Sequence, residues 1–118
     1  MTLDENRFAT IADETLRRLM DAIDGAGADA LEADLRDGIL TIDLESGGQY
    51  IINKHAPNRE IWVSSPASGA WHFAFDEGRR TWIDTRARGP ETATTLDRLL
   101  ERELTAAARA AISLGSGH

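Results

Sequence analysis

QYIINKHAPNREIWVSSP, residues 49–66, is the stretch that decides the fold. Two runs rich in β-branched and aromatic residues flank a four-residue cluster that contains proline and asparagine, a pattern typical of a β-hairpin. Side chains alternate across a strand, so the residues of each run divide between two faces. The face predicted to be buried holds Tyr50, Ile52, Ile61 and Val63, and the opposite face holds Ile51, Asn53, His55, Glu60, Trp62 and Ser64.

Further strands are predicted on both sides of this hairpin. Residues 31–35 and 39–44 alternate around Asp37 and Gly38, and an Asp-Gly pair is the strongest short signal of a hairpin turn. A later run alternates in the same way, followed by a short strand around Trp82 and Ile83. In that run Trp71, Phe73 and Phe75 share one face, and His72 and Ala74 share the other. We predict that Trp71 and Trp82 belong to the core.

A helix is predicted at each end of the chain. Apolar residues recur at helical spacing from about residue 6 to residue 26, and again after residue 94. Asp4, or a capping box of Thr2 and Glu5, can begin the first helix, and Thr94 or Thr95 can cap the last. The first stripe consists of Phe8, Ile11, Ala12, Leu16, Leu19 and Ile23, and the last of Leu96, Leu99, Leu100, Leu104, Ala107, Ala111 and Ile112.

This order of elements predicts an α+β fold, with a single antiparallel β-sheet of five to six strands and the N- and C-terminal helices packed on one face. The other face then has no helix to cover it. Trp62 is expected to lie exposed on that face, beside Asn53 and His55. An exposed aromatic side chain among polar neighbours is typical of a protein-binding surface.

Length and composition restrict the protein further. The 118 residues are expected to form one domain, with a core from about 6 to 112 and a disordered tail from 113 to 118. The chain has no cysteine, which excludes disulfides, thiolate metal sites and cysteine nucleophiles. No apolar run approaches the roughly 18 residues of a membrane-spanning helix, and the N-terminus lacks the regions of a secretory signal. A cytoplasmic location is therefore expected.

The negative charge is concentrated in the first part of the chain. Residues 1–48 contain 12 acidic and 4 basic residues, a charge of −8, whereas residues 49–118 contain 8 and 9, a charge of +1. A surface of that sign repels nucleic acids and anionic membranes, and attracts cations or basic protein surfaces. We therefore expect neither a nucleic acid nor a membrane as a partner.

Several short motifs, spread in register from about Phe8 to Ala107, resemble the frataxin family, whose bacterial members are often called CyaY. They are ADETL at 12–16, DGILTI at 37–42, YIINK at 50–54, PN at 57–58, IW at 61–62, and SSP at 64–66 followed by SG at 68–69. The resemblance implies two helices on an antiparallel sheet, a frataxin-like α/β sandwich. It also implies an iron-binding accessory protein of iron–sulfur cluster assembly, which docks on the complex of cysteine desulfurase and scaffold protein and modulates sulfur transfer and iron delivery.

The resemblance also implies site residues. In the family, iron (Fe²⁺ or Fe³⁺) binds weakly along an acidic ridge on the first helix and first strand, and the sheet face contacts the partner. The matching acidic positions are Asp13, Glu14, Asp21, Asp24, Glu32 and Asp34. The partner-binding positions are Asn53 and Trp62, with His55 standing where the family usually has glutamine. Carboxylate oxygens are ligands that hard iron cations accept, although Arg17 interrupts the acidic sector.

Two other functions remain open at this stage. The acidic ridge could oxidise or store iron as a weak ferroxidase, or the chain could be a protein-interaction module without any metal. We expect an accessory protein rather than an enzyme, and a monomer that iron could assemble into oligomers. His55, His72 and His118 are too far apart in sequence to form a motif. No phosphate-binding loop or serine nucleophile motif is present.

Overall fold

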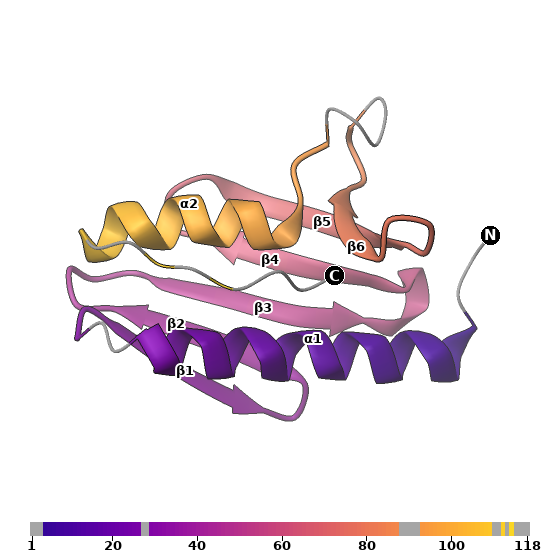
Figure 1. Ribbon diagram of the computed structural model, residues 1–118, viewed down its shortest axis with the longest axis horizontal. Coiled ribbons are helices and arrows are strands. Elements are labelled where there is room, and N and C mark those ends of the chain that lie inside the picture. Colours follow the sequence, from indigo (N-terminus) through magenta and orange to yellow (C-terminus); the bar gives the residue numbers. More distant parts are fainter. Residues whose placement is uncertain (1–3, 27–28, 88–92, 110–111, 113, 115–118) are drawn as a thin grey trace.

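The structure is a computed structural model that describes residues 4–26, 29–87, 93–109, 112 and 114. These residues form one antiparallel sheet of six strands and two α-helices. The strands lie in the sheet in their sequence order, and both helices cover the same face (Figure 1). The predicted α+β architecture is thus confirmed. The elements are α1 (Glu5–Ala26), β1 (Leu31–Arg36), β2 (Ile39–Leu44), β3 (Gln49–His55), a 3₁₀ turn η1 (Ala56–Asn58), β4 (Glu60–Ser65), β5 (Gly69–Asp76), β6 (Thr81–Asp84) and α2 (Leu96–Ala108).

Short polar side chains begin both helices. The backbone N–H of Arg7 donates to Asp4 Oδ1 at 2.8 Å, so Asp4 caps α1, and Thr2 lies outside the described residues. Thr95 Oγ1 accepts from the N–H of Arg98 at 3.2 Å, so Thr95 rather than Thr94 caps α2. Each of these bonds satisfies an N–H that the first turn of a helix leaves unpaired.

The C-terminal helix is shorter than its apolar stripe predicted. Arg109 adopts a left-handed backbone with φ of 53°, which ends α2 at Ala108. The stripe was expected to continue through Ala111 and Ile112. Ala111 is outside the described residues, and Ile112 is buried but not helical. Apolar spacing reports which residues are buried, and a chain that leaves the helix can still bury them.

The core lies between the helices and the sheet. The predicted stripe of α1 and the predicted inward residues of β3 and β4 are all buried. Trp82 is fully buried, and its indole N–H donates to Thr15 Oγ1 at 3.0 Å, whereas Trp71 is half-buried against the core. The prediction of a core position is confirmed for Trp82 and only partly for Trp71.

Two described residues beyond α2, Ile112 and Leu114, are buried and add to this layer. Leu114 is 1% exposed, although the sequence placed it in the tail. Its backbone N–H donates to Glu101 on α2, and its carbonyl accepts from Arg18 on α1. Arg18 also forms an ion pair with Asp97, with 3.0 Å between Nη2 and Oδ1. The backbone of Leu114 therefore bonds to both helices.

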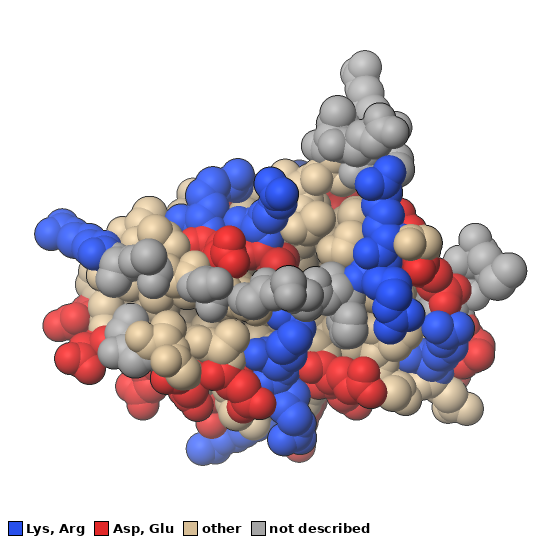
Figure 2. Space-filling model, in the orientation of Figure 1, with Lys and Arg blue, Asp and Glu red and all other residues tan. Residues whose placement is uncertain are grey.

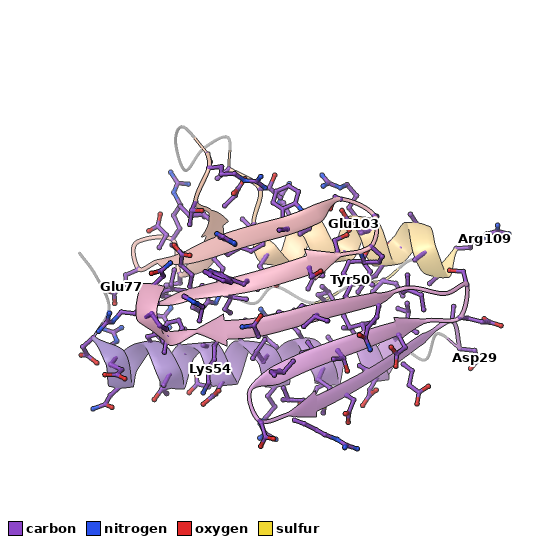
Figure 3. All side chains as sticks on the ribbon, turned by 180° about the vertical axis from the view of Figure 1, so that it is seen from behind. Asp29, Tyr50, Lys54, Glu77, Glu103 and Arg109 are labelled. Carbon is purple, nitrogen blue, oxygen red and sulfur yellow. The ribbon has the colours of Figure 1, made fainter. Side chains whose placement is uncertain are left out.

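No described helix lies over the other face of the sheet, which Figure 3 turns toward the viewer. Half-buried and exposed residues alternate along β1, and buried and less buried residues alternate along β4, so every second side chain points to this open face. Among the described residues, no helix is long and apolar enough to span a membrane.

Candidate functional site

The open face of the sheet brings the three predicted partner-binding residues together. Asn53 lies directly opposite Trp62, and His55 is opposite Glu60 on the same strand pair. On the far side, Trp62 is opposite His72 of β5. Directly opposed residues point to the same side of a sheet and lie within contact distance. Asn53, His55, Trp62 and His72 therefore form one continuous surface.

Two exposed isoleucines extend this surface across the sheet. Ile39 of β2 is opposite Asn53, and Ile51 of β3 is opposite Ser64. Ile39 is 43% exposed and Ile51 is 39% exposed, and they are the large apolar residues that stand out to solvent among the described residues. We call this surface the docking face, after the role that we propose for it below; it consists of Ile39, Ile51, Asn53, His55, Trp62 and His72.

Trp62 lies between two imidazole rings. The ring centroids of His55 and Trp62 are 3.6 Å apart with planes inclined by 9°, and those of Trp62 and His72 are 4.3 Å apart with planes inclined by 11°. Because β3 and β5 flank β4, one imidazole covers each side of the indole. The sequence placed Trp62 on this face and predicted it to be exposed, but the indole is half-buried, because the two histidines, which were not predicted to contact it, pack against its ring. The two histidines that seemed too distant to form a motif thus meet on a single residue.

One hydrogen bond fixes the rotation of the indole. Trp62 Nε1 donates to Glu60 Oε1 at 2.8 Å, on the same strand. Asn53 Nδ2 donates to the carbonyl of Lys54 at 3.2 Å, which leaves its amide oxygen for other partners. His55 Nδ1 is buried and has no hydrogen-bond partner within the described residues. The indole is thus held in place by two stacks and one hydrogen bond.

Acidic residues lie at one end of the same face. Glu32 and Asp34 are exposed on the edge strand β1, and Asp43 of β2 is opposite Glu32. Asp43 accepts a hydrogen bond from Gln49 at 2.7 Å, and Asp34 pairs with Arg36 at 3.0 Å. The open face therefore changes from acidic at β1 and β2 to predominantly aromatic at β3 to β5, where Glu60 and Asp76 are the acidic residues.

The predicted acidic ridge divides between two surfaces. Asp13, Glu14, Asp21 and Asp24 are exposed on α1, in the helical layer, whereas Glu32 and Asp34 point to the open sheet face. All six side chains reach solvent. Figure 2 shows acidic groups along the rim formed by α1 and β1, with basic groups between them.

Asp13 already has a cationic partner. Its Oδ1 accepts from Lys54 Nζ at 2.8 Å, across the gap between α1 and β3 (Lys54 is labelled in Figure 3). Both residues line a hollow of about 460 Å³ together with Arg17, Asp37 and Gly38. A metal ion at Asp13 would therefore compete with the ammonium group of Lys54.

Within the described part of the chain, no three histidine, aspartate or glutamate side chains come together in a group that could hold a metal ion. The six predicted ligands are thus exposed carboxylates spread over several turns and two layers. Such carboxylates can offer one or two oxygens to a hydrated cation.

A second polar cluster lies on the helical side of the sheet. Glu103 of α2 accepts hydrogen bonds from Tyr50 at 2.8 Å, from Ser65 at 2.6 Å and, through its other oxygen, from Ser68 at 2.6 Å. Ser68 in turn accepts from the indole of Trp71 at 2.8 Å. These bonds join α2 to β3, to β4 and to the turn before β5 (Tyr50 and Glu103 are labelled in Figure 3).

This cluster shifts the pKa values of its two acids in opposite directions. Burial, and then the hydrogen bond to Glu103, raise the pKa of Tyr50 to about 12. Burial also raises the pKa of Glu103, but the hydrogen bonds from Ser65, Ser68 and Tyr50 and the charge of Arg102 outweigh it and hold that pKa below its ordinary value. Glu103 therefore acts as an anionic link between the two layers.

The fold and the docking face define a class: an α+β sandwich whose two helices leave one sheet face free. The sequence matches the frataxin-like domain over residues 1–110. It is 38% identical over 106 residues to the mitochondrial frataxin of Arabidopsis thaliana, covering 86% of this chain and 54% of that protein. It is 37% identical over 117 residues to the iron–sulfur cluster assembly protein CyaY of Cupriavidus pinatubonensis, covering 96% and 97%. The chain belongs to the frataxin family.

Solved structures support the same assignment. The frataxin of Psychromonas ingrahamii superimposes with a TM-score of 0.82 over 97% of this chain and 100% of that one, and at 19% identity it supports the fold alone. A trimeric frataxin from the yeast Saccharomyces cerevisiae, complexed with ferrous iron, gives a TM-score of 0.71 at 28% identity and covers 92% of this chain and 89% of that one. The chain spans about half the length of the mitochondrial relatives that it matches, 54% and 52%.

Proposed function

We propose that this protein is an accessory and regulatory protein of iron–sulfur cluster assembly, which docks on the complex of cysteine desulfurase and scaffold protein and carries iron weakly on exposed carboxylates. Two facts support the proposal. The bacterial relatives that the chain matches over nearly its whole length are named iron–sulfur cluster assembly proteins. The open sheet face also presents apolar side chains on adjacent strands, in an arrangement that suits docking.

The observation that carries this proposal is the docking face. A protein surface usually exposes large apolar groups singly, whereas here the exposed Ile39 and Ile51 and the half-buried Trp62 lie on three adjacent strands. Strands of a sheet are rigid, so these side chains keep their arrangement before a partner arrives. A polar amide, Asn53, lies among them and can add a directed hydrogen bond.

Iron binding belongs to the same proposal as a weak property. Fe²⁺ and Fe³⁺ accept carboxylate oxygens, and the exposed acids of α1 and β1 offer them without a closed set of ligands. Ions held in this way keep several waters and exchange readily. The carboxylates thus suit delivery of iron to a partner better than its storage.

Trp62→Ala tests the docking role. We expect the variant to bind the desulfurase–scaffold complex at least about fivefold more weakly, which corresponds to about 1 kcal/mol, and to lose its effect on the rate of cluster assembly. The measurement is the dissociation constant by titration calorimetry, together with assembly rates in the presence and absence of Fe²⁺. Arg98→Ala is the matched control, because Arg98 is exposed on α2, on the helical side.

Two results would contradict the proposal. One is wild-type protein that neither binds the complex nor changes its rate. The other is an equal loss of affinity in Trp62→Ala and Arg98→Ala. Melting temperatures of both variants show whether a loss of binding comes from unfolding.

A further inference from the structure

The C-terminal half of α2 leaves a hollow beside the sheet. Leu104 is fully buried, but further along the helix Ala107 is only half-buried and Ala106 is exposed. An alanine side chain is too short to reach the turns opposite it, so a space of about 440 Å³ remains between α2 and the β2–β3 and β4–β5 turns. The apolar residues that line it from the strand ends and turns are Leu44, Gly47, Pro66 and Ala67.

The two turns that form this wall lie close together. A Cβ on Gly48, whose φ is +98°, would lie 3.2 Å from Cβ of Pro66. A Cβ on Gly47 would meet no atom within 4 Å, so the space beside it is empty. Four charged side chains line the hollow at Asp13, whereas the walls here are mainly hydrocarbon. This hollow therefore suits an apolar group.

Two polar residues also line the hollow, and their polar atoms are already bonded within the protein. Tyr50 donates its hydroxyl to Glu103 Oε1 at 2.8 Å. Ser65 donates to the same oxygen and Ser68 donates to Oε2, both at 2.6 Å. A polar group that entered the hollow would lose its bonds to water without gaining new ones, which is unfavourable. The part of a ligand that enters must therefore be apolar.

The rim of the hollow carries a cation without a partner. Arg102 is exposed, lines the hollow and forms no hydrogen bond or ion pair with the described residues. Five other arginines in this part of the chain do form ion pairs with carboxylates. The charge of Arg102 lowers the pKa of Glu103, but hydroxyl groups already occupy both oxygens of that carboxylate. The guanidinium therefore keeps its donors for an anionic group at the rim.

The charges around the hollow restrict the anion that it can take. Arg109 follows the end of α2, where Figure 3 labels it, and Glu45 is exposed in the β2–β3 turn. Glu45 and Glu103 balance Arg102 and Arg109, so this end of the molecule does not attract polyanions, and the net charge of −7 repels them. A single carboxylate can still bind by direct hydrogen bonds to Arg102.

We propose that this hollow binds a small amphiphilic carboxylate, with its alkyl chain against Ala106, Ala107 and the two turns and its carboxylate on Arg102. A volume of about 440 Å³ is within the range of small-molecule sites. Both helices cover one face of the sheet and the docking face is on the other, so a ligand here does not touch the docking face. The site is also separate from the acidic residues of α1 and β1.

Titration of the isotope-labelled full chain with sodium octanoate, followed by NMR, tests the site. We expect saturable shifts of the backbone amides of Gly47, Ala67, Ala106 and Ala107, with a dissociation constant on the order of 1 mM. Octylammonium has the same alkyl chain with the opposite charge, and acetate has the same charge without the chain. We expect both to bind at least about fivefold more weakly, because each lacks one of the two contacts.

Two arginine variants separate the proposed contact from a general effect of charge on α2. Arg102→Gln removes the cation at the rim, and we expect it to bind octanoate about fivefold more weakly. Arg98→Gln is the matched control, because Arg98 is exposed on the same helix, one turn earlier, and does not line the hollow. Its affinity for octanoate should change by less than about twofold.

Ala106→Leu tests whether the hollow itself holds the alkyl chain. Ala106 is exposed, and leucine is nearly as good a helix former as alanine, so we expect the variant to fold. The longer side chain takes up space in the hollow, and octanoate should bind at least about tenfold more weakly. Melting temperatures of all three variants show whether the fold is retained.

Octylammonium that binds as tightly as octanoate overturns the inference, and so does an equal loss of affinity in Arg102→Gln and Arg98→Gln. Shifts centred on Ile39 and Ile51 overturn it as well, because the alkyl chain would then adsorb to the docking face. So does unchanged affinity in Ala106→Leu, or the absence of saturable shifts up to about 10 mM octanoate. Co-sedimentation with phosphatidylglycerol vesicles that is lost in Arg102→Gln would assign the hollow to a lipid surface and overturn the small ligand. None of these results affects the proposed function, which depends on the docking face.

Discussion

At the residue scale, Glu103 is the anion on which the contact between α2 and the sheet depends. Three hydroxyl groups donate to it, and its pKa is below the ordinary 4.5. We expect Glu103→Gln to lower the free energy of unfolding by about 1–3 kcal/mol at neutral pH, since hydrogen bonds to a charged group are lost. Urea denaturation followed by circular dichroism measures this change.

The stabilisation by Glu103 depends on pH, and its direction follows from the linkage between proton binding and folding. Because the pKa of Glu103 is lower in the folded protein, its stabilisation is present above the unfolded value of about 4.5 and is lost as the pH falls through the folded value. The wild type should therefore lose more stability than Glu103→Gln on acidification. Glu45→Gln, in an exposed turn, should behave like the wild type. A parallel loss in wild type and Glu103→Gln would contradict this role.

Gly38 allows a close approach that a side chain would prevent. Its φ is +76°, and a Cβ there would lie 2.9 Å from Cε of Lys54, the residue that pairs with Asp13. We expect Gly38→Ala to lower the free energy of unfolding by about 1–2 kcal/mol. Gly25→Ala is the control, because Gly25 lies in α1 with no atom within 4 Å of the added methyl, and should be neutral or slightly stabilising. Equal thermal denaturation curves for the two variants would show that the backbone at Gly38 is not restricted.

At the element scale, Leu114 contributes to stability although it lies beyond the end of α2. Leu114 is 1% exposed and bonds to both helices through its backbone. We expect Leu114→Ala to lower the free energy of unfolding by about 2–4 kcal/mol, as for other buried leucines. Ile39→Ala, an apolar truncation at a position that is 43% exposed, should cost less than about 1 kcal/mol. Chemical denaturation of both variants checks this difference, and a larger cost for Ile39→Ala would contradict it.

Patterns within single elements were predictable from sequence. Alternation placed Trp62 and Asn53 on the open face, and helical spacing found the buried stripe of α1, because these depend only on the period of a strand or a helix. The Asp-Gly turn at Asp37 and Gly38 was predictable for a similar reason, since both residues adopt positive φ there.

Contacts between elements were not predictable in this way. The stack needs the exact register of β3, β4 and β5, which sets His72 opposite Trp62, and a shift of one residue would move it to the core side. The Glu103 cluster joins residues 53 positions apart, and the ion pair of Asp13 with Lys54 joins residues 41 positions apart. No local period carries such information, so the division of the acidic ridge between two surfaces could not be foreseen either.

At the scale of the whole molecule, the uneven charge should control association. The first 48 residues carry a charge of −8, and Glu32 and Asp34 belong to the open face. Raising the ionic strength shortens the screening length from about 10 Å at 0.1 M to about 3 Å at 1 M, so docking on a basic partner should weaken with salt. The experiment measures the dissociation constant at several salt concentrations, and the slope of its logarithm against the logarithm of salt concentration reports the effect.

Two variants separate charge from apolar contact in that experiment. Glu32→Gln with Asp34→Asn should flatten the salt dependence, since two carboxylates are removed from the open face. Trp62→Ala should weaken binding at every salt concentration and leave the slope unchanged, because the indole carries no charge. A slope that stays the same without the two carboxylates would show that the acidic end of the face takes no part in docking.

The meander order of the sheet also determines when each part of the chain can pack during synthesis. Each strand pairs with the one made just before it, so every hairpin can close as soon as its second strand has left the ribosome. The first helix is different, because most of the surface on which it packs is supplied by β1, β2, β3 and η1, and Trp82 of β6 adds the rest. When the chain has left the ribosome only as far as Ala30, the apolar stripe of that helix is therefore exposed to water. When it has left as far as Pro66, most of the stripe can be covered, and Phe8 waits for Trp82.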